Sequence, residues 1–299
     1  MICPRTSPRD GLTLSRIAAG MWRLMDWKMS EQALRGYIDD CLALGVTTFD
    51  HADIYGGYAV EEAFGKTLKA HPSLREQIEL VTKTGIALVS PNRPEHRLKH
   101  YNTTPEHIRG AVERSLRNFN TDHLDLLLIH RPDPLMRFDE IAREVEQLKR
   151  AGKIRAFGVS NFTPAQFQAM NTFTPLATNQ IELSPFRTDT ITDGTLDQLQ
   201  GIGVPPMIWS ALGGGRLFAE GNDAAARVRT VASEIADRHD VSMLTVIYAW
   251  LLRLPSDPIV ITGSQRRDAV RDAVTATELQ LDRQEWFAIL EAATGNEVA

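Results

Sequence analysis

The chain has 299 residues, of which 43% are hydrophobic, and its 33 Lys and Arg against 38 Asp and Glu give a formal net charge of −5. This length and apolar content allow a large core, in one barrel-sized domain or in two smaller ones. The mildly acidic balance gives no indication of a nucleic-acid or membrane-surface partner.

The cysteine and histidine content bears on the location of the protein and on metal binding. Cys3 and Cys41 are the two cysteines, too few for a disulfide framework, so we expect a reducing cytoplasm as the location. The first residues lack the apolar stretch of a signal peptide, and no run approaches the roughly 18 apolar residues of a membrane span. The eight histidines show no paired helical spacing and no accompanying carboxylate clusters, so we expect no metal site. The sequence also indicates no protein partner.

Short apolar runs alternate with amphipathic segments of helical period along the whole chain. The runs predict strands at 17–21, 47–50, 78–83, 124–130, 154–160, 177–182, 206–210 and 259–262. The amphipathic segments predict helices at 30–44, 60–70, 105–119, 138–151, 164–171, 195–202, 224–239 and 267–277. Continuous apolar strands are typical of a parallel sheet that is buried on both faces. Eight strand-then-helix units therefore predict a (β/α)8 barrel in a single domain over residues 1–299, with a doubly wound sheet as the alternative.

Some segments exceed this minimal pattern. Further helices are predicted at 242–254 and 283–293, and residues 1–14 are predicted to form a hairpin that covers the barrel floor. The connections 84–103 and 211–223 are unusually long, and both follow strands. Loops of this length are often functional, and in a barrel both would lie on the face where active sites are built.

Polar groups stand at the ends of successive expected strands. Asp50 closes the strand 47–50 and Tyr55 follows it, while Lys83 and His130 close the next two strands. Each residue alone also fits an ordinary structural role: a turn for Asp50 and His130, a packed aromatic for Tyr55 and a solvated strand end for Lys83. Because the carboxyl ends of parallel strands share one face, the four together indicate a common site. A tyrosine, with a pKa of about 10, becomes a usable proton donor when a nearby ammonium stabilises its phenolate.

The same residues carry a family resemblance. Asp50-x-Ala52-x-x-Tyr55, Lys83, Ile129-His130 and the run 158–162 together resemble the aldo-keto reductase superfamily, over nearly the whole chain. The resemblance implies a bacterial, NADPH-dependent aldo/keto reductase, in which a nicotinamide supplies the hydride. It further implies that Tyr55 is the general acid, that Lys83 lowers its pKa, that Asp50 holds Lys83 by an ion pair, and that His130 orients the carbonyl.

The cofactor site rests on this resemblance, because no Gly-x-Gly-x-x-Gly fingerprint occurs between a strand and a helix. The resemblance implies that Ser160, Asn161 and Gln180 bind the nicotinamide carboxamide. Trp209 would stack on the nicotinamide ring. The implied cofactor-binding residues are Gly20, Met21, Trp22, Ser160, Asn161, Gln180, Trp209, Ser210, Leu212, Gly213, Arg216, Gly263, Ser264, Arg266 and Asp272.

The adenosine end departs from the family's commoner pattern. Thr262-Gly263-Ser264 stands where many members have a lysine, and Ala273 replaces an asparagine. A preference for NADPH over NADH therefore rests mainly on Ser264 and Arg266, which would meet the 2′-phosphate at a helix start.

Substrate and reaction class stay open at this point. Trp22, Tyr58 and Tyr101 are expected to bind substrate, which favours an apolar or aromatic aldehyde or ketone, whereas the basic bias of 84–103 could select an anionic carbonyl compound. One alternative is an aldolase or lyase in which Lys83 forms a Schiff base. Another is a nearly silent redox-sensing subunit that binds the cofactor and turns over slowly.

Overall fold

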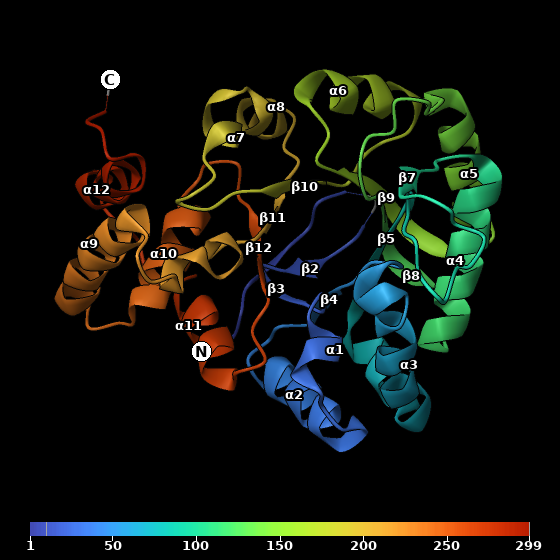
Figure 1. Ribbon diagram of the computed structural model, residues 1–299, viewed down its shortest axis with the longest axis horizontal. Helices are drawn as coiled ribbons and strands as arrows, with labels where there is room; N and C mark the ends of the chain where they lie inside the picture. Colours follow the sequence, from blue (N-terminus) through green and yellow to red (C-terminus); the bar gives the residue numbers. More distant parts are fainter. Residues whose placement is uncertain (10, 299) are drawn as a thin grey trace.

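Eight parallel strands close into a barrel in the computed structural model, which describes residues 1–9 and 11–298. The barrel strands are β3 (Ile17–Gly20), β4 (Thr48–Asp50), β5 (Glu79–Thr84), β8 (Leu124–Ile129), β9 (Ile154–Ser160), β10 (Asn179–Glu182), β11 (Met207–Trp209) and β12 (Ile259–Thr262). β12 pairs with β3, so the sheet closes on itself, and the helices form a ring outside it (Figure 1). The predicted (β/α)8 barrel in a single domain is confirmed, and the doubly wound alternative is excluded because that sheet would stay open.

The ring contains every predicted helix, with ends within two residues of the expected ones. The helices are α1 (Leu24–Trp27), α2 (Glu31–Ala43), α3 (Val60–Ala70), α4 (Pro105–Phe119), α5 (Phe138–Arg150), α6 (Pro164–Phe173), α7 (Asp189–Thr192), α8 (Thr195–Gly201), α9 (Asp223–His239), α10 (Met243–Leu252), α11 (Arg267–Thr275) and α12 (Arg283–Thr294). Short α1 and α7 escaped prediction because a single turn is too short to show a period.

The amino-terminal segment forms a small antiparallel hairpin of β1 (Arg5–Thr6) and β2 (Leu14–Ser15). Leu12 and Leu14 are buried in the cluster that fills the barrel interior. Arg5 donates to Glu79 Oε1 at 2.7 Å, and Glu79 is the first residue of β5. The hairpin therefore lies at the end of the barrel where the strands begin.

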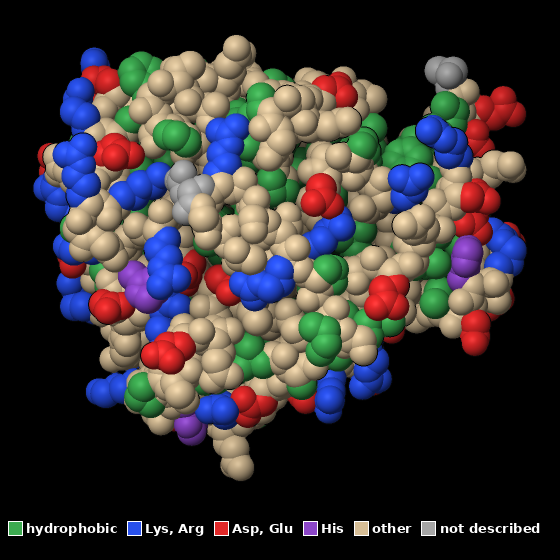
Figure 2. Space-filling view, turned by 180° about the vertical axis from the view of Figure 1, so that it is seen from behind, with side chains coloured by type: hydrophobic (Ala, Val, Ile, Leu, Met, Phe, Trp, Pro, Cys, Tyr) green, Lys and Arg blue, Asp and Glu red, His purple; other side chains and the backbone are tan. Residues whose placement is uncertain are grey.

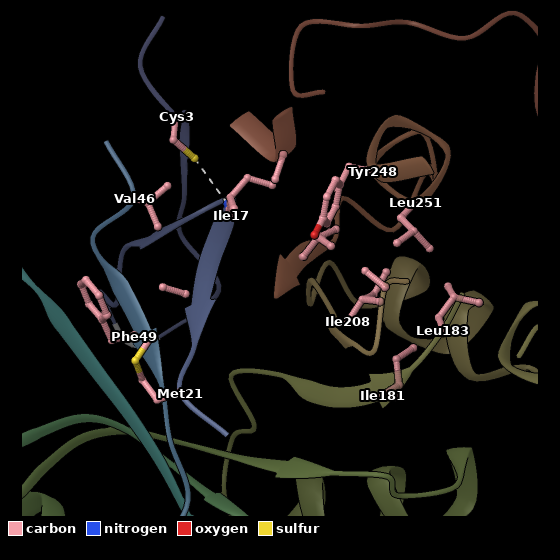
Figure 3. Packing of buried hydrophobic residues seen from close by; sticks show 14 of the residues in the cluster. Cys3, Ile17, Met21, Val46, Phe49, Ile181, Leu183, Ile208, Tyr248 and Leu251 are labelled. Carbon is pink, nitrogen blue, oxygen red and sulfur yellow. Dashed lines mark hydrogen bonds between the residues drawn. The ribbon is translucent and has the colours of Figure 1, made fainter. Parts of the chain in front are cut away.

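Side chains along each strand alternate between two cores. Val81 and Leu126 belong to the interior cluster, whereas Leu80 and Leu127 pack outward against the helices. Figure 3 shows part of the outer core, where the Cys3 thiol accepts a hydrogen bond from the Ile17 N–H at 3.4 Å. This period of two fixes which residue at each strand end points into the barrel mouth.

The long connection after β5 has structure of its own. β6 (Ile86–Ala87) pairs with β7 (His100–Tyr101) in a second hairpin. The Leu88 N–H donates to the Tyr58 hydroxyl at 2.7 Å, and Ser90 Oγ donates to the Gly57 carbonyl at 3.2 Å. These bonds tie the connection to the loop that follows β4.

The surface is of mixed charge. Figure 2 shows acidic and basic side chains interspersed over the face opposite to that of Figure 1, with hydrophobic side chains in small groups between them. Within residues 1–9 and 11–298, no helix combines the length and the apolar character needed to span a membrane.

Candidate active site

A buried ion pair lies at the carboxyl end of the barrel strands. Asp50 ends β4 and Lys83 lies near the end of β5; their side chains point into the barrel and are 3% and 1% exposed. Lys83 Nζ lies 2.9 and 2.8 Å from the two Asp50 carboxylate oxygens and also donates to the His51 carbonyl at 2.7 Å. Gln180 Nε2 from β10 donates to Asp50 Oδ1 at 2.8 Å. The carboxylate is thus held by two strands besides its own.

Tyr55 completes this arrangement. Its hydroxyl lies 3.1 Å from Lys83 Nζ, and its ring meets the His130 ring edge-on, with centroids 5.9 Å apart. Tyr55 opens a 3-10 turn that runs to Gly57, and both glycines of the turn have positive φ (58° and 63°), which a residue with a Cβ rarely adopts. The structure therefore brings together all four residues predicted to be catalytic.

Burial and charge shift the acidities in this cluster. Burial raises the pKa of Tyr55 above its ordinary value, although the charge of Lys83 acts to lower it. Burial alone would lower the pKa of Lys83, but Asp50 and Tyr55 raise it more, so the ammonium stays charged. Burial also lowers the pKa of His130 well below its usual range, with help from nearby cations, so the imidazole is neutral. The expected net lowering of the Tyr55 pKa is thus not found, because burial outweighs the lysine.

Asp50, Tyr55 and His130 line a pocket of about 1120 Å³ at the mouth of the barrel, and Lys83 lies buried behind them. A pocket of this size suits a large ligand, since sites for drug-sized molecules measure about 300–1000 Å³. Many residues predicted for cofactor or substrate line it: Gly20, Trp22, Tyr101, Ser160, Asn161, Gln180, Trp209, Ser210, Leu212, Gly263, Ser264 and Arg266.

One wall of the pocket is a polar cluster around Asn161. Its Nδ2 donates to Ser160 Oγ at 2.7 Å, and its Oδ1 accepts from Trp209 Nε1 at 3.2 Å. Asn161 and Ser210 both have positive φ (59° and 57°), which is uncommon outside glycine. Strained backbone of this kind concentrates at ligand sites, because the surrounding structure must maintain it.

A second wall consists of exposed backbone. Gly214 and Gly215 line the pocket with φ of 65° and 105°. A Cβ on Gly215 would have no neighbour within 4 Å, so its left-handed backbone, rather than crowding, calls for glycine. Beyond them, α11 begins after Arg266, whose side chain makes no capping hydrogen bond. The first N–H groups of that helix are thus available to an anion.

Other predicted residues lie outside the pocket lining. The Met21 side chain is fully buried in the outer core, and the Tyr58 hydroxyl holds Leu88. Arg216 stacks on the Phe186 ring, with Cζ 5.2 Å from its centroid. Gly213 precedes the two lining glycines, and the Asp272 backbone carbonyl accepts from Thr245. These five residues thus contact other parts of the protein and do not line the pocket.

Several lining residues were not predicted. Arg131 follows His130 directly, and its guanidinium carbon lies 5.5 Å from the Trp209 ring centroid. Lys99 belongs to the long loop, and Arg23 follows Trp22 and donates to the Gly214 carbonyl at 2.9 Å. A search for charged neighbours of the predicted site residues would have found Arg131 and Arg23. Across the described residues, no group of three or more His, Cys, Asp or Glu is placed to hold a metal ion.

Comparison with known proteins identifies the family. A family model described as the aldo/keto reductase family matches residues 16–294. The chain is 52% identical over 292 residues to oxidoreductase YdhF of Escherichia coli, and the match covers 97% of each chain. It is 45% identical over 300 residues to a 6-dehydroglucose reductase of Agrobacterium fabrum, with 99% of each covered.

Solved structures show the same relationship. A glycerol dehydrogenase from Gluconobacter oxydans superposes with a TM-score of 0.81 at 25% identity, covering 99% of this chain and 97% of that one. A thermostable aldo-keto reductase in complex with the inhibitor epalrestat gives a TM-score of 0.80 at 25% identity, covering 98% and 100%. Together with the four polar residues at the barrel mouth, these matches place the chain in the aldo/keto reductase family.

Proposed function

We propose that this protein is an NADPH-dependent carbonyl reductase that converts an aldehyde or ketone to an alcohol, with Tyr55 as the proton donor. The observation that carries the proposal is the chain of contacts from Asp50 through Lys83 to the Tyr55 hydroxyl. A phenol that is protonated at neutral pH can give up its proton, and a fixed ammonium 3.1 Å away stabilises the phenolate that remains.

His130 has a separate role in this proposal. It lines the pocket, its ring meets that of Tyr55 edge-on, and its imidazole is neutral because burial lowers its pKa. A neutral imidazole donates from one nitrogen only, so it can hydrogen-bond a carbonyl oxygen without competing as an acid. Tyr55 and His130 would thus hold the same oxygen from two sides.

The residues of the pocket fit a nicotinamide dinucleotide. Ser160, Asn161 and Gln180 offer the donors and acceptors that a carboxamide needs, and Trp209 offers a flat ring. Gly214 and Gly215 leave backbone open to a pyrophosphate. When bound, the cofactor supplies the hydride, which no side chain can provide.

The preference for NADPH rests on the start of α11. Arg266 lines the pocket there, and its backbone N–H donates to Ser264 Oγ at 3.2 Å. A guanidinium beside free helix N–H groups favours a phosphate over a hydroxyl. We expect Arg266→Gln to weaken NADPH binding about tenfold or more and to leave NADH binding nearly unchanged, as measured by quenching of tryptophan fluorescence.

The Schiff-base alternative finds less support. A lysine that attacks a carbonyl must be neutral, which calls for a lowered pKa. Asp50 and Tyr55 instead raise the pKa of Lys83, and its ammonium is occupied by three partners. Borohydride treatment with a carbonyl substrate should therefore leave the mass of the protein unchanged; a trapped adduct on Lys83 would favour the lyase.

The deciding experiment compares two neighbouring tyrosines. Tyr55→Phe should lower kcat for aldehyde reduction at least about a hundredfold, the lower bound for general acid catalysis, while NADPH still quenches tryptophan fluorescence. Tyr58→Phe removes a hydroxyl that faces Leu88 rather than the pocket, so kcat should change no more than a few-fold. Retained turnover in Tyr55→Phe would refute the role of Tyr55. Uniformly slow turnover with tight NADPH binding would favour the redox-sensing subunit.

The substrate and the location are part of the proposal. The similarity to the 6-dehydroglucose reductase of Agrobacterium fabrum supports including oxygen-rich aldehydes in the first substrate screen. We propose the cytoplasm as the location, since Cys3 and Cys41 are both unpaired and buried.

A further inference from the structure

The substrate end of the pocket contains two cations from different loops. Lys99 precedes β7, and Arg131 follows His130 at the end of β8. Alternation along the hairpin places Lys99 and Tyr101 on its pocket side. His100 lies on the other side, where its ring meets that of His96 with centroids 5.6 Å apart. Lys99 and Arg131 thus both line the pocket, from the loops that follow β5 and β8.

Acidic groups of the described pocket lining do not balance these cations. Asp50 is the acid among the lining residues, and Lys83 and Gln180 already hold its carboxylate. No ion pair joins Lys99 or Arg131 to a carboxylate among residues 1–9 and 11–298. The chain as a whole has a net charge of −5. The positive charge is therefore a local property of the pocket, where a concave wall strengthens its field.

The remaining lining cations lie elsewhere. Arg266 stands at the start of α11, and Arg23 donates to the Gly214 carbonyl at 2.9 Å. Both adjoin the surfaces proposed above for the cofactor phosphates. Lys99 and Arg131 line the same pocket as Tyr55 and His130, and the charges of both act on the pKa of His130.

We propose that Lys99 and Arg131 form a subsite for a carboxylate of the substrate, so that the preferred substrate is an anionic aldehyde or ketone. This inference rests on the carbonyl reductase function proposed above and names its substrate class. The guanidinium of Arg131 is kept in place by stacking on Trp209, with its carbon 5.5 Å from the ring centroid. A planar guanidinium can bind a carboxylate through two parallel hydrogen bonds, and Lys99 adds a point charge from the loop after β5.

The electrostatics around His130 support this placement. Burial is the main reason that the pKa of His130 is low, and the charges of Lys83, Arg131 and Lys99 lower it further. Arg131 also acts to lower the pKa of Tyr55. Both cations are therefore close enough to act on the groups that would hold the carbonyl. A purely apolar substrate would remove water from them and offer no counter-charge, which is unfavourable.

The test compares two substrates of nearly the same shape. Para-carboxybenzaldehyde is an anion at pH 7, whereas para-formylbenzamide is neutral. With saturating NADPH, we expect kcat/KM of the wild-type protein to be about 10–100-fold higher for the anion, the range for a hydrogen bond to a charged group. Raising the salt concentration should reduce this ratio.

Variants assign the preference to the two residues. Lys99→Gln and Arg131→Gln should each lower the ratio several-fold, and the double variant should bring it to within about twofold of one. Arg131→Lys keeps the charge but loses the planar guanidinium, so it should keep only part of the preference, more than Arg131→Gln does. Arg97→Gln is the matched control, because Arg97 is an exposed cation of the same loop outside the pocket lining; its ratio should equal that of the wild type.

A binding measurement separates this inference from the proposed function. The alcohols para-(hydroxymethyl)benzoate and para-(hydroxymethyl)benzamide are titrated against tryptophan fluorescence in the presence of NADP⁺, which requires no turnover. If the benzoate binds more tightly and the double variant loses this difference, the subsite is supported even when neither aldehyde is reduced. An absence of turnover would then contradict the proposed reductase function and leave the subsite standing. Equal binding of both alcohols, or an equal loss in Arg97→Gln, would overturn the subsite.

Discussion

The buried pair of Asp50 and Lys83 makes a stability prediction that needs no substrate. Asp50→Asn keeps the shape of the side chain and removes its charge. The Lys83 ammonium is 1% exposed and then has only neutral or carbonyl partners, in His51 and Tyr55, besides the new amide. Removing one partner of a buried ion pair costs about 3–5 kcal/mol. Since domains are stable by about 5–15 kcal/mol, the variant should fold but unfold at a clearly lower urea concentration.

The loss should depend on pH in a defined direction. In the wild type the pKa of Lys83 is raised, so its contribution is fully present below the unfolded pKa of about 10.4 and is lost only as pH rises through the higher folded value. Without Asp50, burial should lower the folded pKa below the unfolded one. The unfolded variant then binds more protons than the folded one between these values, so its stability rises with pH. The free energy of unfolding of Asp50→Asn should therefore approach that of the wild type as pH rises towards 10.

The assay is urea unfolding followed by tryptophan fluorescence from pH 6 to pH 10. Glu62→Gln is the matched control, because Glu62 and Lys66 form an exposed ion pair with side chains 62% and 63% accessible. Such pairs contribute about 0–1 kcal/mol, so the stability difference between Glu62→Gln and the wild type should be small and should not shrink as pH rises. A loss in Asp50→Asn below about 1 kcal/mol, or a deficit that widens with pH, would refute the reasoning.

Two further predictions concern the helical layer and the loop after β4. Burial raises the pKa of Asp53 to about 8, whereas an unfolded aspartate titrates near 3.9, so the folded protein binds the extra proton between these values and loses stability as pH rises. Asp53→Asn should therefore gain stability relative to the wild type from pH 4 to pH 8 in urea unfolding; a constant difference would contradict the shifted pKa. Gly36 in α2 has no atom within 4 Å of an added Cβ, whereas a Cβ on Gly65 in α3 would lie 1.8 Å from the Asn118 carbonyl oxygen. Gly36→Ala should stabilise the protein by about 0.5–1 kcal/mol, whereas Gly65→Ala should destabilise it by about 1–3 kcal/mol. Thermal unfolding measures both changes. Melting temperatures that shift in the same direction in the two variants would contradict this packing.

The barrel could be predicted because its physics is local and repeated. Each strand is a short apolar run, each helix has an amphipathic period, and eight repeats leave few alternatives. The candidate catalytic residues at the strand ends could be predicted for the same reason, since Asp50, Lys83 and His130 each end an apolar run. Alternation also indicates where the Met21 side chain lies: Gly20 lines the pocket, so its neighbour Met21 points to the outer core.

Loop residues were harder to place because their direction depends on distant contacts. Tyr58 was expected to face the substrate, but its hydroxyl accepts the Leu88 N–H from a hairpin 30 residues away in sequence. Lys99 belongs to that hairpin: the basic bias of 84–103 suggests an anionic substrate, but the local sequence does not indicate which of its cations reaches the barrel mouth. His51 is similar: it packs between Phe64 and Phe119, and burial lowers its pKa to about 3.

Tyr55 shows how both kinds of constraint act on one side chain. It lies beyond the end of β4, so strand alternation does not orient it. Its N–H donates to the Ala52 carbonyl at 3.1 Å, and the turn that follows requires left-handed backbone at Gly56 and Gly57. A Cβ on Gly56 would lie 2.5 Å from Met25 Cγ, so the Met25 side chain would have to move in addition to the strain at a positive φ. The turn places the phenol, and Lys83, fixed by β5 and Asp50, provides the charge that any proton transfer from it needs.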